Sequence, residues 1–402
     1  MGVMDGIKVL EVAEQGFVPS AAAILADWGA DVVKVERLTG DPLRGYQAAG
    51  FVADTGDFNN LWEQFNRNKR GVAIDLRNAD GRAALDRLIA WCDVYITSFL
   101  PSARAKLRLD PDDVWAINPR AIYARGHGQG QLGPDADQGG FDSVSYWSRG
   151  GIGHMLTPPD GPFIMQRGAM GDAPSGAFLA GGIAAGLFQR ERTGRGCVVD
   201  VALLASACWT LANDLVPTSV LQQDPVKSTF KPLSTPLVGP YRTADERWVV
   251  LNMLDPDRHW APACRALGLD DYIEHPDYAT AAARAAHNVA IWEVFRDRIA
   301  SLRFAEVIDC LKREDTIFAP LATPMEVLAD PQVTANGYYP RHPEHERARL
   351  AAGPVQIDGA QTTIRRRAPR VGEHTEEVLR EVGMSTSDLA ELRATGALGA
   401  PS

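Results

Sequence analysis

Residues 7–36 decide the fold expected for this chain, and they read IKVLEVAEQGFVPSAAAILADWGADVVKVE. Ile7 to Val12 is a short apolar run typical of a buried strand, and Asp31 to Glu36 is a second such run. Between them lies an alanine-rich stretch, Ser20 to Trp28, which we expect to be a helix that stops at Gly29. A strand, a helix and a second strand in this order predict a βαβ unit with parallel strands.

The same alternation continues toward the middle of the chain. Strand-like runs occupy 71–76, 94–97 and 121–124, and the stretch 78–92 between the first two has a helical apolar face. This pattern predicts a largely parallel, doubly wound sheet in a Rossmann-like large domain. A dinucleotide site would need G-x-G-x-x-G in the first turn, but residues 14–20 read EQGFVPS, so NAD binding is not expected.

A second informative stretch, residues 165–200, places one isolated carboxylate, Asp172, between a glycine-bearing loop and a helix expected from Pro174 to Arg192. On the residues alone, Asp172 is typical of a helix cap, because a carboxylate there accepts backbone N–H bonds. The helix also contains four glycines, each of which lowers the stability of a helix relative to alanine. They indicate that a backbone or a ligand approaches closely, or that the helix packs tightly. They are Gly176, Gly181, Gly182 and Gly186.

Composition narrows the class of protein. The chain has 402 residues, 45% hydrophobic and 23% charged, which is enough for two soluble domains. A net charge of -10 disfavours nucleic acid or an anionic membrane as the main partner. The five cysteines form no C-x-x-C pair, so neither a disulfide framework nor a zinc site is expected. No signal peptide or membrane-spanning run is recognised, and we expect a cytoplasmic protein.

The pair Gly171-Asp172, the small-residue helix and the sequence RERTGRG at 190–196 closely resemble the centre of the family III CoA-transferases, the CaiB/BaiF family. Further segments resemble that family in the same order, and the resemblance spans nearly the whole chain. They are 34–37 with 40–44, 66–77, 97–101, 125–134, 319–333 and 372–379. In this family, the aspartate after the glycine is the catalytic nucleophile, so the resemblance implies that role for Asp172.

The resemblance also implies where coenzyme A is bound, at loops that follow the strands of the large domain. Arg37 and Lys106 are expected to meet the CoA phosphates. The remaining CoA contacts that it implies are Gly16, Phe17, Ile74, Asp75, Leu76, Arg77, Ser98, Phe99, Leu100, His127 and Gly128.

The implied reaction moves CoA from an acyl-CoA donor to a carboxylic acid acceptor through a mixed anhydride and an aspartyl-CoA thioester. With its usual pKa near 3.9, an aspartate is expected to be ionised at neutral pH and to need no general base. Neither a metal nor a permanently bound cofactor is expected. Family members that use oxalate or formate carry a glycine run in the small domain, and residues 238–241 read VGPY, so an oxalate-like acceptor is not expected.

Two alternatives remain for the activity. The related α-methylacyl-CoA racemases use this aspartate with a histidine from a G-H-D motif, but Phe141 stands at that place here, and His127 and His154 lie off the motif. A phenylalanine side chain carries no titratable proton, so racemisation is not expected. The other alternative is a non-catalytic acyl-CoA-binding protein, which the presence of Asp172 disfavours.

The chain is expected to fold as two domains. Segments 222–240 and 319–333 have the Pro-rich, polar composition of linkers. We therefore expect a large CoA-binding domain from 1–221 and 334–402, and a smaller α+β domain at 222–333. The family resemblance further implies an interlocked homodimer, in which each chain passes through the ring of the other.

Overall fold

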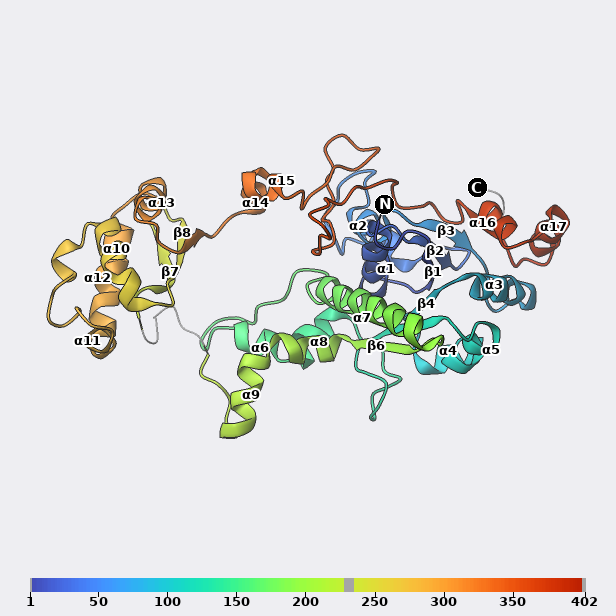
Figure 1. The fold of residues 1–402 in the computed structure, drawn as a ribbon, viewed down its shortest axis with the longest axis horizontal. Coiled ribbons are helices and arrows are strands. Elements are labelled where there is room, and N and C mark those ends of the chain that lie inside the picture. The colour runs from blue at the N-terminus through green and yellow to red at the C-terminus, as the bar shows by residue number, and fades with distance from the viewer. Residues whose placement is uncertain (1, 228–234, 400–402) are drawn as a thin grey trace. The chain divides into compact units, whose positions relative to one another are not determined.

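The computed structural model describes residues 2–227 and 235–399, which form two compact units (Figure 1). The larger unit takes in the chain up to Thr157, Phe163–Pro225 and the chain from Pro331 onward. The smaller unit takes in Pro158–Pro162 and Val226–Asp330. Its boundaries lie a few residues from those expected, and part of the expected linker, residues 228–234, lies outside the described residues.

A six-stranded parallel sheet forms the centre of the larger unit, with the order β3-β2-β1-β4-β5-β6. This is the strand order of a doubly wound parallel sheet, the class of sheet that the alternating strands and helices predict. Val9 of β1 lies opposite Val32 on one side and Val94 on the other, so β1 is an interior strand of the sheet. The strands are β1 (Lys8–Val12), β2 (Asp31–Glu36), β3 (Arg70–Ala73), β4 (Val94–Thr97), β5 (Ile122–His127) and β6 (Val198–Ala202).

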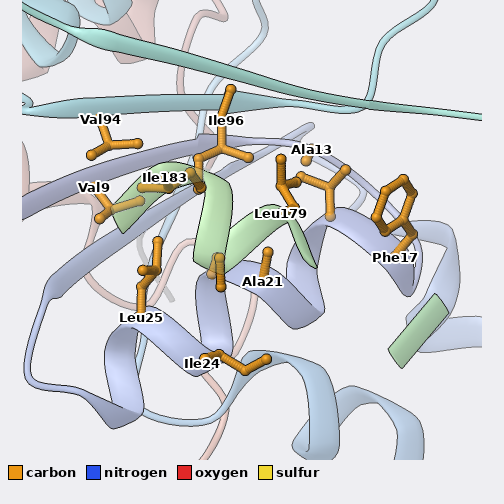
Figure 2. Close-up of a cluster of buried hydrophobic side chains, with 14 of the residues drawn as sticks. Val9, Ala13, Phe17, Ala21, Ile24, Leu25, Val94, Ile96, Leu179 and Ile183 are labelled. Atoms are coloured by element: carbon orange, nitrogen blue, oxygen red, sulfur yellow. The ribbon is translucent and has the colours of Figure 1, made fainter. Parts of the chain in front are cut away.

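Two helices, α1 (Phe17–Asp27) and α7 (Asp172–Thr193), cover one face of the sheet. Figure 2 shows Ala21 and Leu25 of α1 and Leu179 and Ile183 of α7 packed against side chains of β1 and β4. Helix α1 begins three residues earlier than expected, at Phe17, because Pro19 is tolerated in a first helical turn.

The glycines of α7 explain how these two helices approach so closely. A Cβ on Gly176 would lie 1.8 Å from Ser20 Oγ and 3.0 Å from the backbone N of Ala21. Gly182 and Gly186 face Val199, so a side chain at either would press into the sheet. Gly181 is different, since no described atom lies within 4 Å of a Cβ built there. Tight packing therefore accounts for three of the four glycines.

The other face of the sheet is covered by α3 (Ala79–Trp91), α5 (Pro111–Ile117), α16 (Thr375–Glu381) and α17 (Thr386–Ala394). Figure 1 shows the C-terminal helices, in red, in the larger unit with the N-terminal strands. Ile74 forms a bridge with Leu398 instead of extending β3, which is why the strand expected at 71–76 ends at Ala73.

The connections carry five more helices: α2 (Asn60–Asn66), α4 (Pro101–Leu107), α6 (Ile152–Leu156), α8 (Leu203–Thr210) and α9 (Ala212–Leu221). The mostly apolar sequence after Asp200 predicts a single helix as far as Leu215, and this prediction is wrong. The chain instead finishes β6 and forms α8 and α9, which meet at the non-helical Leu211.

The smaller unit has a core of its own. Its antiparallel sheet has the order β7-β8-β9, and its buried residues include Leu251, Trp260, Phe295 and Leu311. The elements are β7 (Val238–Arg242), β8 (Trp248–Asn252), α10 (Pro256–Leu267), α11 (Ala281–Ala286), α12 (Asn288–Ala300), α13 (Phe304–Arg313), β9 (Phe318–Pro320) and α14 (Pro324–Ala329). Helix α15 (Pro331–Ala335) follows in the larger unit. Among the described helices of the whole chain, none has the length and apolar composition needed to cross a bilayer.

Candidate active site

Asp172 is the first residue of α7, and its carboxyl group lies directly over Gly16 at the start of α1. A Cβ on Gly16 would lie 2.4 Å from Asp172 Oδ2, so only glycine leaves room for the carboxyl group. Gly171 is the residue that precedes the helix, and the Asp172 carboxyl group makes no hydrogen bond with any described residue. The capping interpretation is therefore wrong, and no local hydrogen bond accounts for a carboxyl group here.

A pocket of about 270 Å³ opens beside this carboxyl group. Two of its residues that are not glycine have left-handed backbone, Gln15 with φ 74° and Ala169 with φ 65°. Such strained backbone persists only where the surroundings impose it, and it gathers at functional sites. The pocket is lined by Gln15, Gly16, Leu43, Tyr46, Phe51, Val52, Leu61, Phe65, Phe141, Asp142, Ser143, Gly168, Ala169 and Asp172.

The surroundings change the acidity of Asp172. Burial in this apolar pocket raises the pKa of Asp172 to about 8, and the neighbouring Asp142 carboxylate adds to the increase. The residue was expected to be ionised at neutral pH, and that expectation is corrected: at pH 7, the free site holds Asp172 mostly protonated. Once deprotonated, a carboxylate with so high a pKa is more basic than an ordinary aspartate.

Asp142 is a site residue that the sequence did not predict. It begins a π-helical segment, η2 (Asp142–Arg149), and its Oδ1 accepts a hydrogen bond of 2.8 Å from the N–H of Ser143. Irregular helical turns of this kind are frequent at functional sites. The signal was present in the motif at 139–143, in the acidic residue directly after Phe141.

A buried ion cluster beneath the site fixes the loop that contacts Asp172. Lys34 lies between Glu11, at 2.9 Å, and Asp41, at 3.0 Å, and it donates to the carbonyl of Ala13 at 2.8 Å. Asp41 in turn accepts the N–H of Gln15 at 3.2 Å. Burial alone would lower the pKa of Lys34, but the carboxylates around it raise the pKa above its usual value. The charged lysine therefore holds both ends of the turn before Gly16.

The side chain of Gln15 is fixed from the pocket side as well. Tyr46 Oη donates a hydrogen bond of 2.6 Å to Gln15 Oε1. Gln15 and Tyr46 both line the pocket, and the Gln15 amide has N–H donors besides the oxygen that accepts from Tyr46.

A second pocket, of about 580 Å³, lies at the carboxyl ends of β1 to β4. Arg37 lines it and forms a two-pronged ion pair with Glu14, in which Nε donates at 2.9 Å and Nη2 at 2.6 Å. Arg77 pairs with Asp75 at its rim, and this pairing lowers the pKa of Asp75. The pocket brings together six expected CoA contacts: Arg37, Ile74, Asp75, Leu76, Arg77 and Phe99.

One loop contributes lining residues to both pockets. Glu14 lines the larger pocket, while the next residues, Gln15 and Gly16, line the pocket of Asp172. Ser98 Oγ accepts the N–H of Glu14 at 3.0 Å, so this expected contact supports the loop. A long ligand that fills the larger pocket could thus bring its end to Asp172.

The remaining expected contacts lie elsewhere. Phe17 is buried beneath Gly126, and Gly128 packs on Gly140. His127 is buried with its Nε2 at 3.3 Å from Asp200, and burial lowers its pKa despite that carboxylate. None of these three lines either pocket.

Two expected contacts lie at the two ends of α4, next to the larger pocket in sequence. Leu100 is the residue that precedes α4, and Lys106 is exposed in its last turn, next to Leu107, which lines the pocket. Their contact with CoA stays a prediction.

Comparisons with known proteins agree over almost the whole chain. The sequence model of CoA-transferase family III matches residues 4–375. A succinyl-CoA–L-malate CoA-transferase beta subunit from Chloroflexus aurantiacus is 31% identical, with 97% of each chain covered. A formyl-CoA:oxalate CoA-transferase from Rhodopseudomonas palustris is 29% identical, covering 99% of this chain and 98% of that protein.

A solved structure is also similar. The crystal structure of a CaiB/BaiF family protein from Brucella suis superposes with a TM-score of 0.82 at 26% identity. The match covers 95% of this chain and 99% of that one. The parallel sheet and the small antiparallel sheet described above are thus those of an established fold.

Proposed function

The chain belongs to CoA-transferase family III, and on this premise we propose that Asp172 is the nucleophile that carries CoA from an acyl-CoA to a carboxylic acid. The enzyme is a CoA-transferase, and its substrates include a CoA thioester. The observation that carries the proposal is the Asp172 carboxyl group, which faces a pocket, has no hydrogen-bond partner among the described residues and has a pKa of about 8.

The proposed reaction has four exchanges. The Asp172 carboxylate attacks the thioester carbonyl of the donor, the C–S bond breaks, and a mixed anhydride and CoA thiolate form. The thiolate then attacks the Asp172 carbonyl, which releases the donor acid and leaves an aspartyl-CoA thioester. The acceptor carboxylate attacks this thioester, giving a new anhydride and thiolate. Attack of the thiolate on the acceptor's carbonyl yields the new acyl-CoA and restores Asp172.

The elements around Asp172 suit these steps. The N–H donors of Gln15 and the backbone N–H groups of the loop before α7 are candidates to stabilise the tetrahedral oxyanions. The raised pKa requires that a proton leave Asp172 before its carboxylate attacks the thioester. We propose that the larger pocket holds the nucleotide end of CoA, because it lies beside the same loop and carries Arg37 and Arg77 at its rim.

The nucleophile is tested with Asp172→Asn in a CoA-exchange assay. An amide is a far poorer nucleophile than a carboxylate, so activity should fall by several orders of magnitude. Hydroxylamine added during turnover of the wild type should leave a hydroxamate on the peptide that contains Asp172, detected by mass spectrometry. Near wild-type transfer by the variant would remove Asp172 from this role.

Whether Asp172→Asn still folds needs a separate control. The raised pKa of Asp172 predicts the direction in which the melting temperature should change. The folded-state pKa of Asp172 is raised above its unfolded value, so the wild type loses stability as pH rises from about 4 to about 8. Asparagine does not titrate, so Asp172→Asn should melt higher than the wild type at pH 8, with a smaller difference at pH 5. A variant that is inactive because it is misfolded would melt lower at both.

Racemisation is the alternative activity within the fold. Among the described residues that line the pocket of Asp172, none is a histidine, and Phe141 occupies the place of the racemase base. His154 is exposed on α6 and lines neither pocket. We therefore propose that proton exchange at the α-carbon is absent or minor. Entry of solvent deuterium into a 2-methylacyl-CoA at the rate of turnover would contradict this.

We also propose that the enzyme is an interlocked homodimer. Apolar side chains lie exposed along α7, α8 and α9 of the larger unit, including Phe188, Trp209 and Val220. Trp209 is 74% exposed and borders, with Phe178, a further pocket of about 370 Å³. Because large exposed apolar patches are rare on monomeric proteins, we propose that a second copy of the chain covers these side chains.

A further inference from the structure

One wall of the pocket of Asp172 is formed mostly by apolar side chains, and it comes from the chain between β2 and β3. Leu43 and Phe65 are buried, and the ring of Tyr46 lies edge-on to that of Phe51 with 5.3 Å between centroids. Val52 and Leu61 complete this wall, which we call the 43–65 wall. An acyl chain placed over Asp172 would therefore lie on hydrocarbon.

The charges in the pocket have one sign. Besides Asp172, its lining contains Asp142, and among the described lining residues there is no lysine, arginine or histidine. A second carboxylate on the substrate would approach Asp142 with no cation among the described lining residues to pair with it. Like charges that approach each other without a cation between them disfavour binding.

From this lining we propose that the acids exchanged by the enzyme are apolar monocarboxylates with branched, aromatic or medium-length acyl groups, and not dicarboxylates. This rests on the proposed function, because it treats Asp172 as the group that meets the carboxyl end of the acid. The volume agrees with it, since a cavity of about 150 Å³ holds a benzene ring, and this pocket has about 270 Å³.

Two cations are adjacent in sequence to the pocket lining. Arg44 follows Leu43, but it is held in an ion pair with Glu36 at 2.7 Å. The other cation is Arg167. It lies one residue before Gly168, but it is exposed and does not line the pocket. If the loop moved Arg167 into the pocket, its guanidinium would be the group that pairs with the second carboxylate of a dicarboxylate. Substitution of Arg167 separates that case from the one that we propose.

The test uses self-exchange, in which donor and acceptor carry the same acyl group, so no second acid has to be identified. Each acyl-CoA is incubated with its own ¹³C-labelled acid, and label in the acyl-CoA is followed by mass spectrometry. Hexanoate is compared with adipate and pentanoate with glutarate, because the members of each pair differ only in a terminal methyl or carboxylate. We expect kcat/KM for the monocarboxylate to exceed that for the dicarboxylate at least tenfold, and 3-phenylpropanoate to be exchanged as well.

A charge variant tests the wall directly. Val52→Arg should place a cation in the pocket and reduce the monocarboxylate preference at least tenfold. Val3→Arg, which makes the same change at an exposed valine of the N-terminal turn that does not line this pocket, should leave the preference unchanged. Arg167→Ala should also leave it unchanged. If Val52→Arg does not fold, as judged by its melting curve, the wild-type pairs alone decide the inference.

The outcomes separate this inference from the function on which it rests. Exchange of adipate as fast as hexanoate, abolished by Asp172→Asn, would overturn the inference and leave the nucleophile in place. Loss of a dicarboxylate preference in Arg167→Ala would overturn it in the same way. Exchange of neither acid of either pair by the wild type would contradict both.

Discussion

The raised pKa of Asp172 determines how the rate should depend on pH. The deprotonated carboxylate is the attacking form, so kcat/KM should rise with pH, about tenfold per unit below the pKa, and level off above about 8. Burial and the charge of Asp142 both raise this pKa, so Asp142→Asn should move the rise to lower pH. Initial rates between about pH 5.5 and about pH 9.5 measure both curves. An acid limb near pH 4 in the wild type would refute the assignment.

Arg37 offers a test of the nucleotide pocket. Its guanidinium is already paired with Glu14, so a CoA phosphate would gain a charge-assisted bond while competing with that pair. Arg37→Ala should raise KM for the acyl-CoA severalfold, equivalent to about 1 kcal/mol, with kcat nearly unchanged. Arg265→Ala is the matched control, because Arg265 forms a similar exposed pair with Glu314 in the smaller unit. Equal KM values in all three proteins would place CoA elsewhere.

At the scale of single residues, the resemblance of its motif pointed to Asp172 but not to its pKa, because burial among segments distant in sequence, and then the nearby Asp142, determine that pKa. Gln15 was passed over for the same reason. Its role depends on Tyr46 and on a buried lysine cluster, contacts that only the fold creates.

Helix packing gives the prediction at the scale of elements. In Gly176→Ala, the new methyl group would overlap Ser20 Oγ, and separating α1 from α7 should lower the free energy of unfolding by about 1 to 3 kcal/mol. Gly181→Ala should raise it by up to about 1 kcal/mol, because the site is open and alanine favours the helix. Urea unfolding of both variants makes the comparison. Equal effects would mean that the glycines serve only the helix itself.

The apolar periodicity of the sequence predicts most helices and strands of the larger unit. It does not predict the residues at which they end. The strand expected at 71–76 is cut short because Ile74 pairs with Leu398, more than three hundred residues away in the chain. The long helix expected after Asp200 is interrupted at Leu211, where no proline or glycine marks the break. Neither end can be predicted from the local sequence, because contacts made in the folded chain determine where these elements stop.

At the scale of the whole molecule, an interlocked homodimer should not dissociate into monomers on dilution. If each chain passes through the ring of the other, dissociation requires partial unfolding, so light scattering at micromolar concentration and mass photometry at nanomolar concentration should both give twice the mass of one chain. Denaturant should release monomers only as the fold is lost. A monomer at micromolar concentration would contradict the proposal.

At the scale of the whole molecule, chain length and the composition of two linkers predict two domains, and the structure has two units with separate cores. No argument from composition specifies which acid is exchanged. That information lies in the 43–65 wall, whose six side chains have no motif in common and meet Asp172 only after folding.

The origin of the 43–65 wall has a consequence for how such an enzyme diversifies. Asp172, the proposed nucleophile, begins α7, and the turn before α1 lies against it, so closely that a Cβ at Gly16 or Gly176 would clash with its neighbours. The wall that meets the acid comes from one connection between two strands. Mutations there can exchange one substrate for another while the reacting groups stay where they are. Natural or directed evolution can therefore change the acid that the enzyme exchanges by mutating a segment of about two dozen codons.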